Sequence, residues 1–299
     1  MSHFNVRGSI VAIVTPMRED DSVDNEALKK LLVWHLESQT QAIVAAGTTG
    51  ESPTLSMKEN QRLIADTVQW SSGRIPIIAG VGSNATAEAV LLTRRAAADG
   101  ANAGLSVIPY YNNPTQEGLF RHFSTVANCS DMPIIIYDVP GRCVASINTD
   151  TLERLAQHPN IIGIKDATGN QSLAKERFLA LPENFLFYSG NDSTACAYML
   201  TGGHGVISVT ANVAPLQMQQ MSAAALAGDV HGANAKDAHL QPFHLAQGIE
   251  SNPIPVKWVL ADEGRIAPTI RLPLIPLAER YHETVRQAVI ASRQTTLRS

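Results

Sequence analysis

Short apolar runs rich in valine and isoleucine recur along the chain, and each is followed by polar or glycine residues and a longer helical pattern. Their starts lie roughly 20 to 33 residues apart, which is the length of one strand and one crossover helix. The pattern therefore predicts eight strand–helix units. The expected strands are residues 10–15, 42–46, 75–79, 104–108, 133–137, 161–165, 185–188 and 205–209.

Helix-start signals stand between several of these runs. Asp24 precedes a helical spacing of leucines, and Ser56 and Glu59 have the spacing of a capping box. Thr86 precedes an alanine-rich stretch. Side chains of these types accept hydrogen bonds from the first free N–H groups of a helix, so we expect helices to begin at these three places.

Nearly continuous hydrophobic strands are typical of a parallel sheet covered by helices. Eight units of this length predict an α/β protein with a (β/α)8 TIM barrel. A doubly wound sheet would need a phosphate-binding glycine loop after its first strand, and Thr15-Pro16-Met17 is no such loop. Strand signals stop after residue 228, so we expect a catalytic barrel over residues 1–228 and a C-terminal helical domain over residues 229–299.

The composition is that of an ordinary globular protein of 299 residues, with 44% hydrophobic and 17% charged residues. A formal net charge of −4 gives no basic surface for a phosphate backbone, so no nucleic acid is expected as a partner. The apolar run at residues 9–17 is too short to span a bilayer and ends in no signal-peptide cleavage site. We therefore expect no membrane association and a cytoplasmic location.

Motifs for common cofactors and metals are absent from the sequence. Neither the P-loop pattern nor G-x-G-x-x-G occurs, and there is no H-E-x-x-H or G-x-S-x-G. The three cysteines lie far apart and form no C-x-x-C pair. We therefore expect neither a cofactor nor a metal.

Polar residues stand at the carboxyl ends of the predicted strands, where a barrel of this kind assembles its site. Two threonines, three tyrosines, an arginine, a lysine and an Asn-Asp pair would meet at this mouth. They are Thr48, Thr49, Tyr110, Tyr111, Tyr137, Arg142, Lys165, Asn191 and Asp192.

Lys165 ends an apolar run, on the strand face that also carries Gly163. The small glycine would leave space for the lysine inside the barrel. A lysine withheld from water has its charged form disfavoured, and the neutral amine is what Schiff-base formation with a ketone requires. Alternatively, Lys165 pairs with Asp166 or another acid as a structural charge at the strand end.

The other candidates have two readings each. Tyr137 can relay a proton or serve as an ordinary core tyrosine. Arg142 can bind a substrate carboxylate or stand solvated on an exposed turn. The glycine-flanked pair Thr48-Thr49 can offer N–H groups to a carboxylate or form a plain strand-to-helix turn.

Several longer motifs resemble one known family. They are residues 8–16, 47–52, 109–112, 137–140, 163–169, 252–258 and 271–273. Together they resemble the dihydrodipicolinate synthase family of class I pyruvate-dependent aldolases, a superfamily that also contains N-acetylneuraminate lyase. The resemblance runs almost from end to end of the chain.

The resemblance implies a specific reaction. Lys165 would condense with pyruvate to an imine and then an enamine, and the enamine would attack the aldehyde of L-aspartate semialdehyde. The amino group of this second substrate would then cyclise onto the imine carbon and release the lysine. The product would be 4-hydroxy-tetrahydrodipicolinate, a precursor of diaminopimelate and lysine.

It also implies roles for the proton-carrying groups. Tyr137 would be the acid and base of imine formation, and Thr48 would link it to Tyr111. In the family this second tyrosine reaches across from the neighbouring subunit. The protein would then be at least a dimer, and the resemblance implies a tetramer built as a dimer of dimers.

Four further residues would bind the substrates. The resemblance assigns the pyruvate carboxylate to Thr49 and the carboxylate of L-aspartate semialdehyde to Arg142. Gly190 and Ile207 match positions that line the pyruvate pocket.

The chain departs from the family pattern at a few positions near the site. Asp138 stands where Asn is usual, Ile108 where Thr is common, and Cys143-Val144 where Thr-Gly usually follows the arginine. An extra carboxylate at Asp138 would raise the pKa of the neighbouring Tyr137 by like-charge repulsion. We therefore expect a shifted pH optimum.

A lysine-binding regulatory pocket is partly retained. The residues that match it are Ser52, Asn84, Glu88 and Tyr110. Met57 and Asn60 replace two histidines found there in the enteric bacterial form. We therefore expect weak or absent inhibition by L-lysine.

Two other functions are open. A related aldolase would cleave N-acetylneuraminate or a 2-keto-3-deoxy sugar acid through the same lysine. A barrel without catalytic activity would bind a small carboxylate and form no imine, since a fold alone does not imply an activity.

Overall fold

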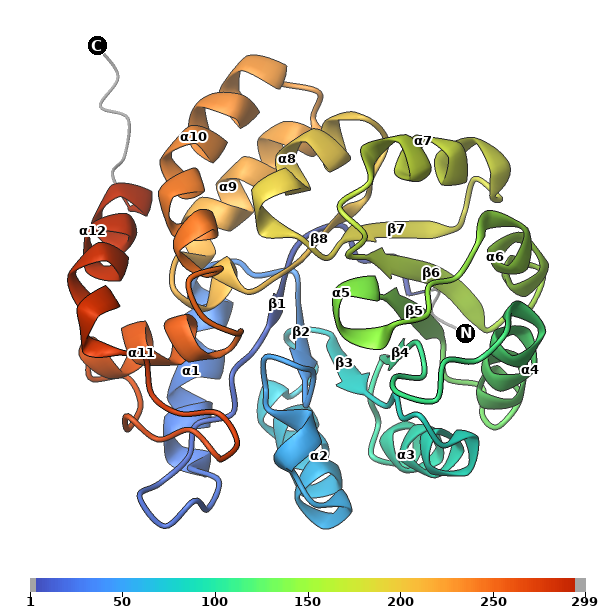
Figure 1. Cartoon of the computed structure of the whole chain (residues 1–299), viewed down its shortest axis with the longest axis horizontal. Helices are drawn as coiled ribbons and strands as arrows, with labels where there is room; N and C mark the ends of the chain where they lie inside the picture. The colour runs from blue at the N-terminus through green and yellow to red at the C-terminus, as the bar shows by residue number, and fades with distance from the viewer. Residues whose placement is uncertain (1–3, 294–299) are drawn as a thin grey trace.

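At the centre of the computed structural model, which describes residues 4–293, is a closed barrel of eight parallel strands (Figure 1). The strands are β1 (Gly8–Ala12), β2 (Ala42–Ala45), β3 (Ile77–Gly80), β4 (Ala103–Val107), β5 (Ile134–Asp138), β6 (Ile161–Asp166), β7 (Leu186–Ser189) and β8 (Gly205–Ser208). Pairing of β1 with both β2 and β8 closes the ring. The predicted (β/α)8 barrel is therefore confirmed.

The first strand ends earlier than predicted. The apolar run was expected to be a strand over residues 10–15, whereas β1 spans Gly8–Ala12. The backbone N–H of Val14 donates to the side chain of Asn212 at 3.0 Å, and the Thr15 hydroxyl donates to the carbonyl of Gly50 at 2.7 Å. Hydrogen bonds to side chains and loops thus replace the ladder at the mouth of the barrel.

Helices surround the barrel and connect its strands. They are α1 (Asn25–Glu37), α2 (Met57–Ser71), α3 (Thr86–Ala98), α4 (Gln116–Ala127), α5 (Pro140–Cys143), α6 (Thr149–Ala156), α7 (Gln171–Ala180), α8 (Asp192–Leu200) and α9 (Pro215–Leu226). The described residues also form three short 3₁₀ helices, η1 (Ser52–Thr54), η2 (Thr210–Asn212) and η3 (Glu279–Tyr281). Within residues 4–293, none of the helices is both long and apolar enough to cross a membrane.

Two of the three predicted helix starts are confirmed. Asp24 accepts hydrogen bonds from the first turn of α1, and Ser56 and Glu59 form a complete capping box on α2. Such caps stabilise a helix by about 1 kcal/mol. Thr86 is wrong as a cap, because it is the first residue of α3 and its hydroxyl pairs with His122 instead.

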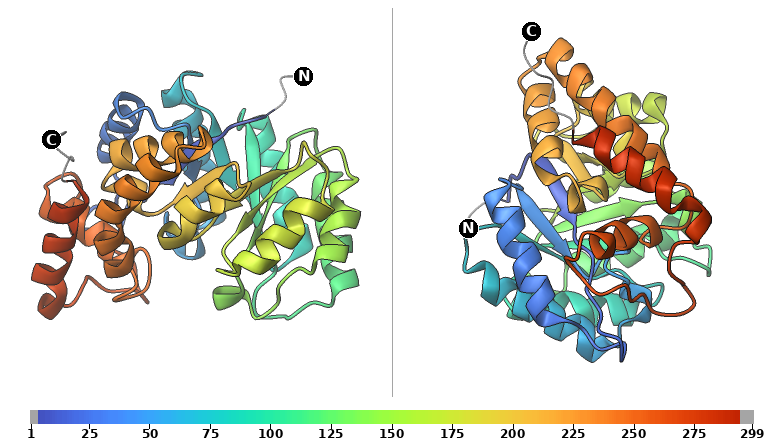
Figure 2. Two further views of the ribbon diagram at one scale, coloured as in Figure 1. Left: turned by 90° about the horizontal axis from the view of Figure 1, so that it is seen from above. Right: turned by 90° about the vertical axis from the view of Figure 1, so that its left-hand side faces the viewer.

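The chain after β8 is helical, as predicted. After α9 it continues through α10 (Val230–Ala246), α11 (Ile254–Asp262) and α12 (His282–Ser292), which lie together on one side of the barrel (Figures 1 and 2). Helix α10 packs on α8, α9 and α12. The guanidinium of Arg265 lies over the ring of Trp34 in α1 at 3.6 Å. A separate domain starting at residue 229 stays a prediction.

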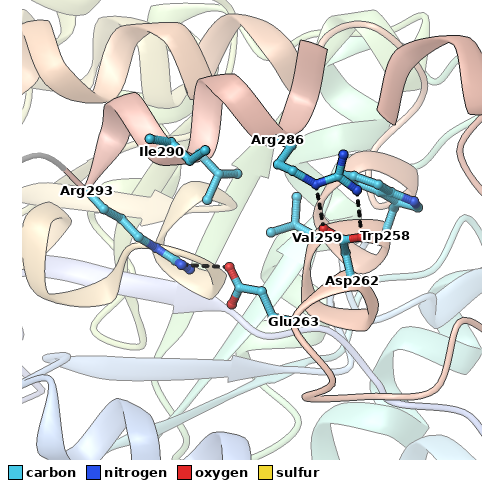
Figure 3. Close-up of a pocket in the computed structure, with 8 residues that line it drawn as sticks. Trp258, Val259, Asp262, Glu263, Arg286, Ile290 and Arg293 are labelled. Atoms are coloured by element: carbon cyan, nitrogen blue, oxygen red, sulfur yellow. Dashed lines mark hydrogen bonds and ion pairs between the residues drawn. The ribbon is translucent and has the colours of Figure 1, made fainter. Parts of the chain in front are cut away.

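Ion pairs flank a cavity of about 400 Å³ between α11 and α12 (Figure 3). Arg286 makes two hydrogen bonds to Asp262, at 2.9 and 3.1 Å, and Arg293 pairs with Glu263 at 2.6 Å. The apolar part of the wall comes from Trp258, Val259, Val289 and Ile290. These contacts tie the last helix to α11, away from the strand ends that carry the predicted site.

Val144 has a strained backbone. Its φ of 54° and ψ of −54° lie in a region that β-branched residues avoid. The N–H of Ala145 donates to the carbonyl of Cys143, which makes a tight γ-turn around Val144. The family resemblance implies glycine at this position, and glycine adopts positive φ without a steric penalty.

We predict that V144G stabilises the protein by about 1 kcal/mol, because it removes this strain while the exposed valine loses little packing. Urea unfolding measures the effect. The matched control is V33G, which replaces another exposed valine within α1 and should lower stability. A V144G protein that is less stable than the wild type would contradict the strain.

Candidate active site

Lys165 and Tyr137 lie side by side at the carboxyl ends of two neighbouring strands. They are register partners of β6 and β5, and the Lys165 Nζ lies 4.2 Å from the centre of the Tyr137 ring. Both side chains are buried, with 5% and 8% of their surface exposed. The closed barrel therefore fixes an amine against a phenol with little water around either.

Burial alters the amine. The pKa of Lys165 is lowered to about 8, mainly by burial; the Asp192 charge opposes this shift, and the Arg142 charge contributes to it. About one lysine in ten is then neutral at pH 7, compared with well under one in a thousand for a lysine in water. Lys165 is thus a stronger nucleophile than an ordinary lysine.

Asp166 is not the partner of Lys165. The two residues point to opposite faces of β6, and the Asp166 carboxylate accepts a hydrogen bond from Arg177 at 2.9 Å. Thr168 donates to the same carboxylate through its N–H and its hydroxyl. The interpretation of Lys165 as a structural partner of Asp166 is therefore wrong.

The space around Lys165 comes from a different glycine than the sequence suggested. A side chain at Gly163 would meet the backbone of Leu186 in the next strand, at 2.5 Å from its carbonyl oxygen. A Cβ at Gly190, however, would lie 2.6 Å from the Cβ of Ala167 and 3.1 Å from the Cε of Lys165. Gly190, at the end of β7, therefore leaves the room that the lysine occupies.

The phenol of Tyr137 stays protonated at neutral pH. Burial raises its pKa to about 12, the positive charge of Arg142 opposes this, and Cys143 and Asp138 add smaller increases. The expected repulsion from Asp138 therefore has the predicted direction but is not the main cause. Arg177 holds the Asp138 carboxylate at 3.0 Å, which reduces its effect on the phenol.

A cavity of about 190 Å³ opens beside these two groups. Seven of the predicted site residues contribute to its wall, together with residues from three other strand ends and from the C-terminal part of the chain. The lining is Ala12, Val44, Gly47, Thr48, Thr49, Leu105, Tyr137, Val139, Arg142, Lys165, Ala167, Gly190, Asn191, Val209 and Asn252.

Asn252 connects two of the predicted carboxylate-binding residues. Its side-chain amide donates to the hydroxyl of Thr49 at 3.0 Å, and its backbone carbonyl accepts from the guanidinium of the exposed Arg142 at 3.2 Å. The sequence motif at residues 252–258 included this residue without a role for it. Nothing in a local pattern connects positions that lie 203 and 110 residues apart.

A buried ion pair supports the turn that carries Thr48 and Thr49. Glu51 follows this turn in a left-handed conformation, and its carboxylate accepts from the Lys257 ammonium of α11 and from the N–H of Arg271. Lys257 also donates to the carbonyl of Thr15 at 3.1 Å. Burial lowers the pKa of Lys257, while the Glu51 charge opposes this change. The C-terminal segment therefore fixes the turn that carries Thr48 and Thr49.

A second cavity, of about 420 Å³, shares Gly47, Thr48, Tyr137 and Arg142 with the first. Three of the four residues matched to the lysine pocket contribute to its wall, as do both residues that replace histidine. They are Ser52, Glu88 and Tyr110, with Met57 and Asn60. Asn84 lies outside this lining, and its carbonyl accepts a hydrogen bond from Asn112.

Besides Asn84 and Asp192, two further predicted site residues lie outside both cavity linings. Tyr111 is 90% exposed on the loop after β4, with a φ of 72°. Ile207 is fully buried within β8, and Val209 contributes to the first cavity instead. The structure thus brings Thr48, Thr49 and Tyr137 together with Lys165, but not Tyr111 of the same chain.

The chain is similar to one family of known proteins over almost its whole length. The model of the dihydrodipicolinate synthetase family matches residues 5–292. The 4-hydroxy-tetrahydrodipicolinate synthase of Alcanivorax borkumensis is 54% identical over 94% of this chain and 97% of its own length. That of Thiobacillus denitrificans is 52% identical over 95% of this chain and 96% of its own length.

A solved structure is similar over the whole fold. The crystal structure of the chloride-inhibited dihydrodipicolinate synthase from Acinetobacter baumannii, complexed with pyruvate, has a TM-score of 0.94 and 49% identity. The similarity covers 96% of this chain and 99% of that one. Together with the family match, it shows that the chain belongs to the dihydrodipicolinate synthetase family.

Proposed function

We propose that this protein catalyses the 4-hydroxy-tetrahydrodipicolinate synthase reaction, in which pyruvate condenses with L-aspartate semialdehyde. The observation that carries the proposal is the buried amine of Lys165, with its pKa lowered to about 8, beside the phenol of Tyr137. The relatives with 52% and 54% identity carry the name of this activity.

In the proposed reaction, the neutral amine of Lys165 attacks the ketone carbon of pyruvate and forms a C–N bond. Loss of water gives an imine, and removal of a methyl proton gives an enamine. The enamine carbon forms a C–C bond to the aldehyde of L-aspartate semialdehyde. The amino group of that substrate then adds to the imine carbon, and the C–N bond to Lys165 breaks.

Tyr137 is proposed to move the protons of imine formation. Its raised pKa keeps the phenol protonated, so it can protonate the hydroxyl that leaves as water. Thr48 lines the same cavity and would relay the proton to the partner subunit's Tyr111. The exposure of Tyr111 in the single chain supports a shared site, and hence a homo-oligomer, for which we propose a dimer of dimers.

The residues that contact Asn252 are proposed to bind the carboxylates of the two substrates. Thr49 would hold the carboxylate of pyruvate and Arg142 that of L-aspartate semialdehyde, with Gly190 and Ile207 shaping the pyruvate pocket. Asn252 contacts Thr49 and Arg142, so it would hold both anion-binding groups in place. A cytoplasmic location belongs to the same proposal, as expected for an enzyme of amino-acid biosynthesis.

The test is turnover of the two substrates together. The wild type should consume pyruvate only when L-aspartate semialdehyde is present, and it should release no pyruvate from N-acetylneuraminate or 2-keto-3-deoxy sugar acids. K165A should lose turnover while remaining folded, whereas K175A, which removes an exposed lysine of α7, should keep it. Release of pyruvate from a sugar acid, without condensation, would favour the related aldolase.

The pH dependence should follow the Lys165 amine. Its pKa is lowered to about 8, and only the neutral form attacks, so the proposed step gains reactive amine as the pH rises. We predict that kcat/KM for pyruvate rises about tenfold per pH unit below this pKa and then levels off. D192N removes a charge that raises the pKa and should move the rise to lower pH. A rise that continues to the pKa of an ordinary lysine would contradict this account.

L-lysine should inhibit weakly or not at all, because Met57 and Asn60 stand in the second cavity where the enteric form has histidines. Steady-state assays with increasing L-lysine measure the inhibition. The double variant M57H/N60H restores the two imidazoles and should increase the sensitivity. Submillimolar inhibition of the wild type would contradict the prediction.

A further inference from the structure

A fully buried arginine joins the two strands that carry Lys165 and Tyr137. Arg177 of α7 donates to Asp166 in β6 at 2.9 Å and to Asp138 in β5 at 3.0 Å. It also donates to the carbonyl of Ile147 at 2.6 Å. A single guanidinium thus spans β5 and β6 from behind the cavity.

The register places this contact directly behind the reacting groups. Tyr137 pairs with Lys165, and Asp138 pairs with Asp166 one residue later. Successive side chains of a strand point to opposite faces, so the amine and the phenol face the cavity while the two carboxylates face α7. Any movement of β5 relative to β6 at this level therefore changes the distance between Lys165 and Tyr137.

The charges of the cluster depend on the arginine. Burial raises the pKa of Asp138, whereas Arg177 and the hydroxyl of Ser146 oppose that change. Asp166 repels Asp138 and raises its pKa further. Without the guanidinium, the Asp138 carboxylate would lie near that of Asp166 in a buried space with no positive partner, and Asp138 would take up a proton or push the strands apart.

The other titratable groups near the cluster stay neutral. They are Tyr198 of α8, whose pKa is raised by burial and by Asp166, and Cys143 of α5, whose pKa is raised to about 11 by burial and by Asp138. Asp138, whose pKa is already raised by burial, is therefore the group that would respond to pH when Arg177 is removed.

We propose that Arg177 is a positioning residue, which holds the Lys165 amine against the Tyr137 phenol by bridging Asp138 and Asp166. The proposal rests on the proposed function only in using its turnover as a readout.

The test compares R177M with R177M/D138N, in full-length protein, by kcat, the KM for pyruvate and the melting temperature over a range of pH. R177M should lower kcat by about a hundredfold at alkaline pH, because a small displacement of the reacting groups costs that much. The KM should change little. The loss should shrink as the pH falls, since protonation of one carboxylate removes the repulsion. Adding D138N should restore most of kcat and abolish the extra pH dependence.

Two further variants keep the test decisive. R177K keeps the positive charge, so it should fold even where R177M does not. Its ammonium cannot bridge both carboxylates as the planar guanidinium does, so kcat should fall about tenfold. R154M removes an exposed arginine of α6 and should leave kcat unchanged. A folded R177M or R177K with a lower melting temperature but wild-type kcat and pH profile would overturn the proposal, as would a loss that D138N does not rescue. A wild type without any turnover would instead overturn the proposed function.

Discussion

The pairing of β5 with β6 in the closed barrel is the constraint on which the site depends. It sets Tyr137 beside Lys165, 4.2 Å from ring centre to amine, and it buries both. Burial then shifts both pKa values, because it disfavours the ammonium of the lysine and the phenolate of the tyrosine. One structural constraint thus yields a nucleophile that loses its proton easily and an acid that keeps its own.

The residues around this pair come from distant parts of the chain. Asn252 contacts Thr49 and Arg142, and Lys257 holds Glu51 under the threonine turn. Breaking a buried ion pair of this kind typically costs about 3–5 kcal/mol, because the remaining charge is left without a partner. The helices after residue 228 are therefore part of the site's support, whether or not they form a domain of their own.

Local patterns were sufficient to predict the eight strands, two of the three expected helix starts and most of the groups at the barrel mouth. Valine and isoleucine runs reveal buried strands, and caps such as Asp24 depend only on residues two or three positions away. The end of β1 was missed because Val14 and Thr15, which follow it, bond to the distant Asn212 and Gly50. No local pattern shows such contacts.

The support of the site could not be predicted for the same reason. Arg177 and Gly190 act through neighbours on other strands, and their roles follow from the barrel's register rather than from their sequence surroundings. The pKa of Tyr137 was expected to rise through Asp138, but burial is the larger cause, and burial is a property of the whole barrel. The family resemblance assigned roles to side chains, whereas only the structure showed what holds them.

The proposed function rests on an imine between Lys165 and pyruvate. Borohydride reduction in the presence of pyruvate, followed by intact-mass and peptide analysis, tests it most directly. We expect one pyruvate-derived adduct per chain, located on Lys165 and absent from K165A. No adduct on correctly folded wild-type protein, or an adduct on another lysine, would contradict it and leave a barrel that binds small carboxylates without this chemistry.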